Sequence, residues 1–187
     1  VGAQAQTAST QMGASATATT ASGTAKLTAA DRKAIMDMAM SNMAEVEMGK
    51  MAQSKSQNAD VKAFGQKMVD DHGKALTEVQ TLAQSKGVTL PTELDAKHKA
   101  LAAKLEKANG DAFDKAYTKQ GGVAAHKDTL AKLQKASKAA KDADVKGQVD
   151  KTIPVVQEHL KHAEQVASGK MGSTGSSGAA GHTGASH

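Results

Sequence analysis

Apolar residues between Leu27 and Ala167 recur every three or four positions, which is the spacing of one face of an α-helix. Five stretches carry this pattern, and residues that typically begin or end helices separate them. We expect helices over residues 27–56, 58–86, 92–108, 111–140 and 142–168. The first should begin with a capping box, because Thr28 at the N-cap stands three residues before Asp31. The clusters of β-branched and aromatic residues that are typical of strands are nearly absent.

The lengths of the connections predict how these helices are arranged. Tight turns join the first helix to the second and the fourth to the fifth, so each pair should form an antiparallel hairpin. The connection between the hairpins contains Gly87, Pro91 and then the short third helix, which is long enough to run back along the bundle. We therefore predict an all-α, ferritin-like four-helix bundle, made of two antiparallel hairpins with a short crossover helix.

The two ends of the chain differ from its middle in composition. Residues 1–26 are rich in Ala, Thr and Ser, and residues 169–187 are rich in Gly, Ser and His. Neither segment has enough apolar residues to offset the entropy of ordering, which costs ~1–2 kcal/mol per residue for the backbone alone. We expect one helical domain at residues 27–168 between two disordered tails.

Composition excludes several classes of function and suggests a location. The chain has no cysteine, which excludes disulfides, thiolate metal sites and cysteine nucleophiles. Its net charge of +5 comes from scattered lysines with one arginine, and aromatic residues make up 2%, so we expect no nucleic-acid partner. No apolar run reaches 18 residues, which predicts no transmembrane segment. The chain begins at Val1 without Met, as a protein does after signal-peptide removal, so we expect a periplasmic or secreted protein.

Four polar residues lie on or beside the expected inner faces of the four long helices. His72 and His159 fall within the apolar faces of the second and fifth helices, His126 at the edge of the fourth and Glu45 on the flank of the first. All four lie near the middle of their helices, so they can share one level of the bundle. Three imidazoles and a carboxylate can hold a transition metal ion, Zn²⁺, Fe²⁺ or Cu²⁺. The alternative is a structural network in which these core polar groups satisfy one another and set the register of the helices.

Enzymatic activity is not expected. A di-iron oxidase on this fold would need two Glu-x-x-His motifs, but Val69 stands three residues before His72 and Val156 three before His159. No Gly-x-Ser-x-Gly elbow supports a hydrolase, and Gly121-Gly122 lacks the context of a phosphate loop. This glycine pair should instead permit a close helix approach or loosen its helix. We expect a non-enzymatic envelope protein with a binding or stress-related role, and the alternative is a metal-binding bundle.

Methionines form a second feature of the first helix. Met36, Met40 and Met43 follow one another at i, i+4 and i+7 on the face opposite the core. An exposed apolar ridge of this kind predicts a covering element, either the crossover helix or a second copy of the protein in a homo-oligomer. Thioethers also bind Cu(I), but copper proteins of that kind usually repeat tighter Met and His motifs.

An ordered series of motifs resembles a known bacterial family. The series consists of AEVEMGKMA at 44–52, VKAFGQKMVDDH at 61–72, FDKAY at 113–117, His126, Ile153-Pro154 and His159-Leu160. It is similar to a family that is defined by a domain of unknown function and often described as periplasmic or outer membrane proteins. The resemblance covers the whole helical region. It implies a ferritin-like bundle that is made with a signal peptide and located in the envelope, and it implies no settled activity.

Overall fold

The computed structural model describes residues 26–169. Its elements in chain order are α1 (Ala29–Lys55), α2 (Ala59–Ser85), α3 (Ala96–Lys107), α4 (Gly110–Ala116), the π-helical segment η1 (Tyr117–Ala124), α5 (Ala125–Ala139) and α6 (Ala143–Ala167). Within these residues there is no strand, which confirms the predicted all-α fold. The tails expected to be disordered fall almost entirely outside the described residues, so that expectation stays a prediction.

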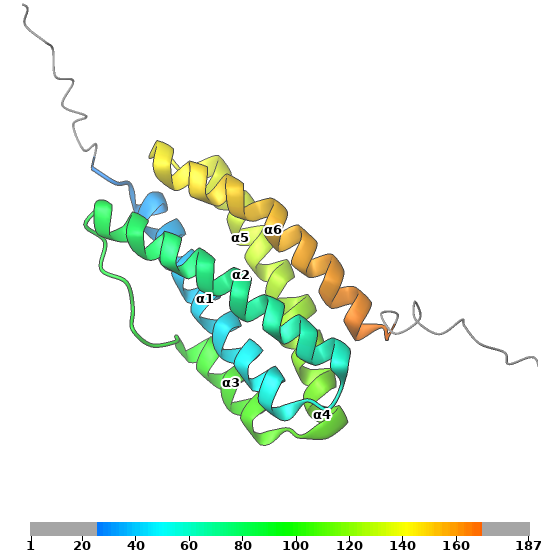
Figure 1. Ribbon diagram of the computed structural model, residues 1–187. Helices are drawn as coiled ribbons and strands as arrows, with labels where there is room; N and C mark the ends of the chain where they lie inside the picture. Colours follow the sequence, from blue (N-terminus) through cyan, green and yellow to red (C-terminus); the bar gives the residue numbers. More distant parts are fainter. Residues whose placement is uncertain (1–25, 170–187) are drawn as a thin grey trace, which may run out of the picture.

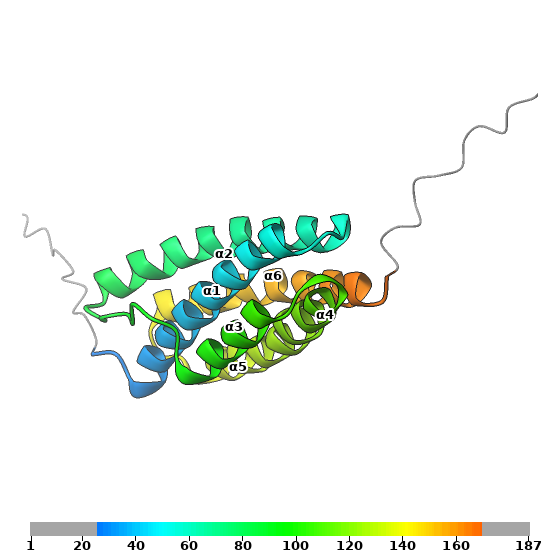
Figure 2. The same cartoon turned by 90° about the horizontal axis from the view of Figure 1, so that it is seen from below.

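Two antiparallel hairpins form the body of the protein (Figure 1). Helix α1 packs along α2, and α5 packs along α6, while α4, η1 and α5 follow one another without a break in the helix. Helix α3 connects the hairpins and lies beside α1 (Figure 2). The predicted pair of hairpins with a crossover helix is therefore confirmed. None of the helices in residues 26–169 is both long and apolar enough to cross a membrane.

The start of α1 is tied to the start of α6 by one carboxylate. The Thr28 hydroxyl accepts a hydrogen bond from the Asp31 N–H at 3.1 Å, and Asp31 Oδ2 accepts from the Thr28 N–H at 3.1 Å, which confirms the capping box. The other oxygen of Asp31 accepts from the backbone N–H groups of Lys141 at 2.8 Å and Asp142 at 3.2 Å. Asp31 thereby caps one helix and holds the loop before another.

Small residues allow α1 and α2 to approach closely. A Cβ atom added to Gly65 would lie 2.7 Å from the Cβ of Ala52 and 2.9 Å from the backbone oxygen of Gly49. No side chain fits between backbones at this separation. The glycines therefore set the distance between α1 and α2, and with it the position of every side chain that α2 presents to the core.

A polar layer divides the hydrophobic core into two parts. The cluster nearer the α1–α2 turn is built around Phe64, Met68, Phe113 and Tyr117. The cluster nearer the opposite end contains, among others, Ile35, Val79, Val145 and Val149. Between them lie the buried polar side chains of Asn42, Glu45, His72, His126 and His159. The candidate site occupies this layer.

Candidate metal centre

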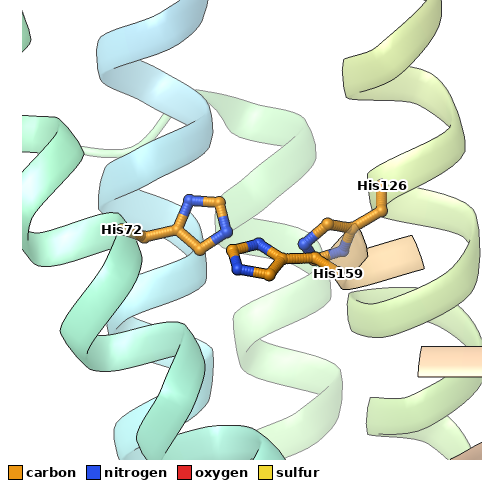
Figure 3. Close-up of side chains that lie close together, drawn as sticks. All are labelled: His72, His126 and His159. Atoms are coloured by element: carbon orange, nitrogen blue, oxygen red, sulfur yellow. The ribbon is translucent and has the colours of Figure 1, made fainter. Parts of the chain in front are cut away.

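Three histidines from three helices meet in the polar layer. His72 of α2, His126 of α5 and His159 of α6 point toward one another (Figure 3). One ring nitrogen of each lies within 4.8 Å of those of the other two, and the ring centroids are 5.0–5.5 Å apart. The three residues are only 1–3% exposed. We call His72, His126 and His159 the histidine triad.

His72 and His126 each present Nε2 as the atom with the lone pair. The Nδ1–H of His72 donates to Asn42 Oδ1 at 2.7 Å, and the Nδ1–H of His126 donates to the backbone oxygen of Gly122 at 2.7 Å. Because both partners are oxygen acceptors, they place the proton on Nδ1 and leave Nε2 unprotonated. Neither Nε2 atom has a hydrogen-bond partner among the described residues.

His159 presents its other nitrogen, Nδ1. Its Nε2–H donates to Asp71 Oδ2 at 2.7 Å, and Lys67 Nζ lies 3.0 Å from the same oxygen. Burial raises the pKa of Asp71, but the hydrogen bonds from His159 and Lys67 outweigh it, so the pKa is lowered and the carboxylate is ionised. The Nδ1 of His159 therefore carries the lone pair and finds no hydrogen-bond partner within residues 26–169. A carboxylate behind the ring is the support that metal-binding histidines commonly have.

The π-helical segment η1 positions the carbonyl that anchors His126. A π-helix bonds each N–H to the carbonyl five residues back and often marks a functional site. Gly122 lies in this segment and offers its oxygen to the His126 ring. A Cβ at Gly122 would lie 3.1 Å from the Cβ of Ala163, so α6 also approaches closely here. The glycine pair Gly121-Gly122 thus combines both expected effects, an altered helix and a close helix contact.

The triad is electrically neutral at pH 7. Burial lowers the pKa of His72 far below its usual range, and the neighbouring rings of His126 and His159 lower it further. Burial also lowers the pKa of His126 to about 4 and that of His159 in the same direction. Three lone pairs thus converge with no donor for them in the described part of the chain. A structural network would pair such buried groups, because an unsatisfied buried acceptor costs ~1–3 kcal/mol.

Glu45 lies beside the triad and is not one of the residues whose ligand atoms converge. Its Oε1 is 3.6 Å from Nδ1 of His126, the nitrogen that faces Gly122 and not the nitrogen that faces the other rings. Glu45 is 3% exposed, and burial raises its pKa well above the usual range. Its Oε2 has no hydrogen-bond partner in the described residues. Of the four candidate ligands, the structure therefore brings the three histidines together.

Sequence reasoning did not find the residues that support the triad. Asn42 lies on the expected inner face of the first helix, but the helical pattern does not indicate which residue it bonds to. Asp71 was expected to lie on an exposed face of the second helix. The available signal for Asp71 was its place directly before His72. Neighbouring residues of a helix point about 100° apart, so Asp71 does not lie at the centre of the core face as His72 does. It lies at the boundary with α6, where it meets His159.

The methionine ridge is partly covered by the crossover. Met36, Met40 and Met43 are half-buried. Met43 packs against the core cluster that includes Leu94 and residues of α3, and Met40 Sδ accepts a hydrogen bond from the Asp95 N–H at 3.3 Å. The crossover helix and the loop before it thus rest on the ridge. A homo-oligomer through α1 stays a prediction.

Solved structures with the same fold include metal-bound proteins. CopM in the Cu(II)-bound form is 17% identical, with a TM-score of 0.62 over 74% of this chain and 96% of that chain. CopM in the Ag-bound form is 17% identical, with a TM-score of 0.60 over 76% and 98%. A DUF305 fragment from Deinococcus radiodurans is 11% identical, with a TM-score of 0.67 over 76% and 97%. At these identities the likeness shows a shared helical fold.

Comparison of sequences identifies the family. Curated proteins give no significant match to the chain. Residues 16–166 match the family described as "Domain of unknown function (DUF4142)". This match spans the five predicted helices almost completely and agrees with the resemblance found in the sequence motifs. The chain therefore belongs to the DUF4142 family, a bacterial family of helical bundles defined by a domain of unknown function.

Proposed function

We propose that the histidine triad binds a transition metal ion, with copper as the first candidate. One observation carries this proposal: three buried imidazole nitrogens converge with their lone pairs directed inward, and no group of the described residues bonds to them. Each ring is also held from behind by an oxygen acceptor. A cation at the centre would satisfy all three lone pairs at once.

The spacing of the nitrogens fits a metal ion after a small movement. Three nitrogens that each lie ~2.0–2.1 Å from one ion in tetrahedral geometry are about 3.4 Å apart. The ligand atoms of the triad lie within 4.8 Å of one another, so the side chains would need to close by about 1 Å. Three histidine ligands leave a fourth coordination position free for water or another small ligand.

Copper is favoured by ligand chemistry and by the fold. Imidazole suits Cu, Zn, Fe and Ni, and among divalent ions of the first transition row affinity is highest for Cu²⁺. CopM, which has the same fold, has been solved with Cu(II) and with Ag. Holding a metal is favoured over turnover, because the triad is only 1–3% exposed and does not line either of the two cavities that flank α3.

A titration of metal-free, untagged protein with Cu²⁺ and Zn²⁺ tests this proposal. We expect one tight equivalent in the wild type and at least a hundredfold weaker binding in His72→Ala, His126→Ala and His159→Ala. His98→Ala and His162→Ala serve as matched controls, because neither residue belongs to the triad, and they should bind as the wild type does. A triad variant that keeps wild-type affinity while folded, as judged by circular dichroism, would contradict the proposal.

We further propose that the protein acts in the bacterial envelope. The triad contains no thiol and the chain has no cysteine, so an oxidising compartment would leave its imidazole ligands unchanged. Fractionation of cells that express the full-length gene tests this location. Recovery in the periplasmic or secreted fraction would support the proposal, and recovery only in the cytoplasm would contradict it.

A further inference from the structure

A cavity of about 400 Å³ lies between α1, α5 and the crossover, whose arrangement Figure 2 shows. The histidines of the triad do not line it. We propose that this cavity binds one uncharged molecule that has an alkyl chain and a terminal hydroxyl, such as a medium-chain alcohol. The site uses no triad nitrogen, so it does not depend on the function proposed above.

The cavity is long and narrow. Its lining follows α1 from Ala34 to Met48, a length of ~21 Å at 1.5 Å per residue, and it follows η1 and α5 from Gln120 to Ala136 over a similar length. A volume of about 400 Å³ spread over this length corresponds to a width of about 4–5 Å. Carbon atoms in contact are ~3.5–4.0 Å apart, so the cavity is as wide as one extended hydrocarbon chain. At ~30 Å³ for each non-hydrogen atom, the share of a water molecule in the liquid, it holds about 13 such atoms.

The wall of the cavity is apolar along its length. Among the large apolar side chains that line it are Met36, Met38, Met40, Met48, Leu101 and Leu133. The methionines are spread along α1, so each would contact a different part of an extended chain. Unbranched thioether side chains adjust easily to the shape of an apolar ligand. The wall therefore suits an alkyl chain better than a compact ligand.

The charged side chains of the lining, apart from Glu45, already have partners. The pairs are Asp128 with Lys97 and Lys132, Asp37 with Lys33, and Asp95 with His98. A charged ligand would therefore find no free counter-charge among these residues, and a charge that leaves water without one costs free energy. The lining favours an uncharged ligand.

Glu45 marks the place where the polar group of the ligand would sit. It lines the cavity near the Met48 end and is only 3% exposed, and its Oε2 has no hydrogen-bond partner in residues 26–169. Leaving a buried oxygen without a partner costs free energy, which a hydrogen bond to the ligand would recover. A hydroxyl both donates and accepts, so it can pair with this oxygen in either protonation state of the carboxyl. A charged end group would lose its hydration at this depth.

Methionine-methyl NMR of the metal-free full chain tests this site, with 1-decanol as the probe. This alcohol has slightly fewer non-hydrogen atoms than the cavity holds. We expect 1-decanol to shift the methyl signals of the four methionines that line the cavity, Met36, Met38, Met40 and Met48. The signals of Met43 and Met51, which line the cavity on the other side of α3, should stay unchanged. Sodium decanoate, which has a similar chain with a carboxylate, should bind at least tenfold more weakly.

Two pairs of variants, each first shown to be folded by circular dichroism, provide the controls. Glu45→Gln keeps a hydrogen-bonding group and should bind 1-decanol as the wild type does, whereas Glu45→Leu should bind it about three- to tenfold more weakly. Ala125→Phe places a ring in the cavity and should abolish the methionine shifts, whereas Ala103→Phe places the same ring in the other cavity and should leave them unchanged.

Four results would overturn the proposal. The first is that 1-decanol shifts none of the methionines of the cavity, and the second is that it shifts Met43 and Met51 as strongly. The third is that decanoate binds as tightly as the alcohol. The fourth is that Glu45→Leu or Ala125→Phe binds 1-decanol with the affinity of the wild type.

Discussion

Replacing Gly65 by Ala perturbs the contact that brings α1 and α2 together. The added Cβ would lie 2.7 Å from the Cβ of Ala52 and 2.9 Å from the backbone oxygen of Gly49, whereas carbon atoms in contact are normally about 3.5–4.0 Å apart. Neither neighbour is a flexible side-chain end, so the two helices must separate. Overpacking of this kind costs ~1–3 kcal/mol, and the higher helix propensity of Ala returns ~1 kcal/mol. Because the added atom meets a Cβ and a backbone oxygen, the cost should lie near the upper end, ~3 kcal/mol, which leaves a net loss of about 2 kcal/mol in the free energy of unfolding.

Urea denaturation followed by circular dichroism measures this loss. Gly147→Ala in α6 is the matched control, because a Cβ there would meet no atom within 4 Å. This control should gain ~0.5–1 kcal/mol from helix propensity alone. Gly65→Ala should also weaken metal binding, because α2 carries His72. If Gly65→Ala were as stable as the wild type while Gly147→Ala gained stability, the inferred spacing of α1 and α2 would be refuted.

Local chemistry explains why most helix boundaries could be predicted. The capping box of Thr28 and Asp31 and the positive φ of 68° at Gly87 lie where the sequence places a start and a stop. The third helix was expected from residue 92 but begins at Ala96. Its start is set by Asp95, whose side chain accepts from the His98 N–H at 2.9 Å. The residues from 92 to 95 have a composition that a helix tolerates, so the periodic pattern alone did not show that the helix starts after them.

The π-helical segment could not be predicted because its cause is tertiary. Gly121 and Gly122 indicate only a place where a helix can deform, whereas the close contacts that this segment makes with Met48 of α1 and Ala163 of α6 come from other helices. Such contacts join residues that are distant in the chain and leave no periodic signal.

The triad could be predicted because facing and height along a helix follow from sequence position. The place of Glu45 next to His126, away from the converging nitrogens, depends on side-chain rotation and on the distance between α1 and α5, which a helical pattern does not contain. The same limit hid Asn42 and Asp71, whose partners lie on other helices.

Three further predictions concern pH and the supporting residues. The metal-free protein should lose stability as pH falls from about 6.5 toward 4, because the pKa of His126 is near 4 in the folded state and about 6.5 in the unfolded state. The unfolded chain then binds the proton before the folded chain does, which lowers the free energy of unfolding by about 3 kcal/mol for this residue. A urea midpoint that does not change between pH 6.5 and pH 4 would contradict the neutral triad. Asp31→Ala should lower the free energy of unfolding by ~1–2 kcal/mol at pH 7, because one cap and two loop contacts are lost. The pKa of Asp31 is lowered in the folded state because the hydrogen bonds from Thr28, Asp142 and Lys141 outweigh burial, so its contribution is present above the unfolded pKa and lost as pH falls. The difference in melting temperature between Asp31→Ala and the wild type should therefore shrink below pH 4. A difference that stays constant with pH would count against this role of the Asp31 carboxylate. Asp71→Asn should weaken metal binding by about 10–100-fold with little change in helicity, because a neutral amide behind His159 makes the imidazole a less basic ligand than a carboxylate does. Equal affinity of the variant and the wild type in a competition titration would show that Asp71 does not support the ligand.

The histidine side chains themselves provide the most direct test of the proposed metal site. Long-range ¹H–¹⁵N NMR reports which nitrogen of each ring carries a proton and which binds a metal. In the metal-free protein we predict the proton on Nδ1 of His72 and His126 and on Nε2 of His159. One equivalent of Zn²⁺ should then shift the three opposite nitrogens together and leave His98 and His162 unchanged. Zn²⁺ that leaves the three rings unshifted, or shifts only histidines outside the triad, would contradict a metal centre at His72, His126 and His159.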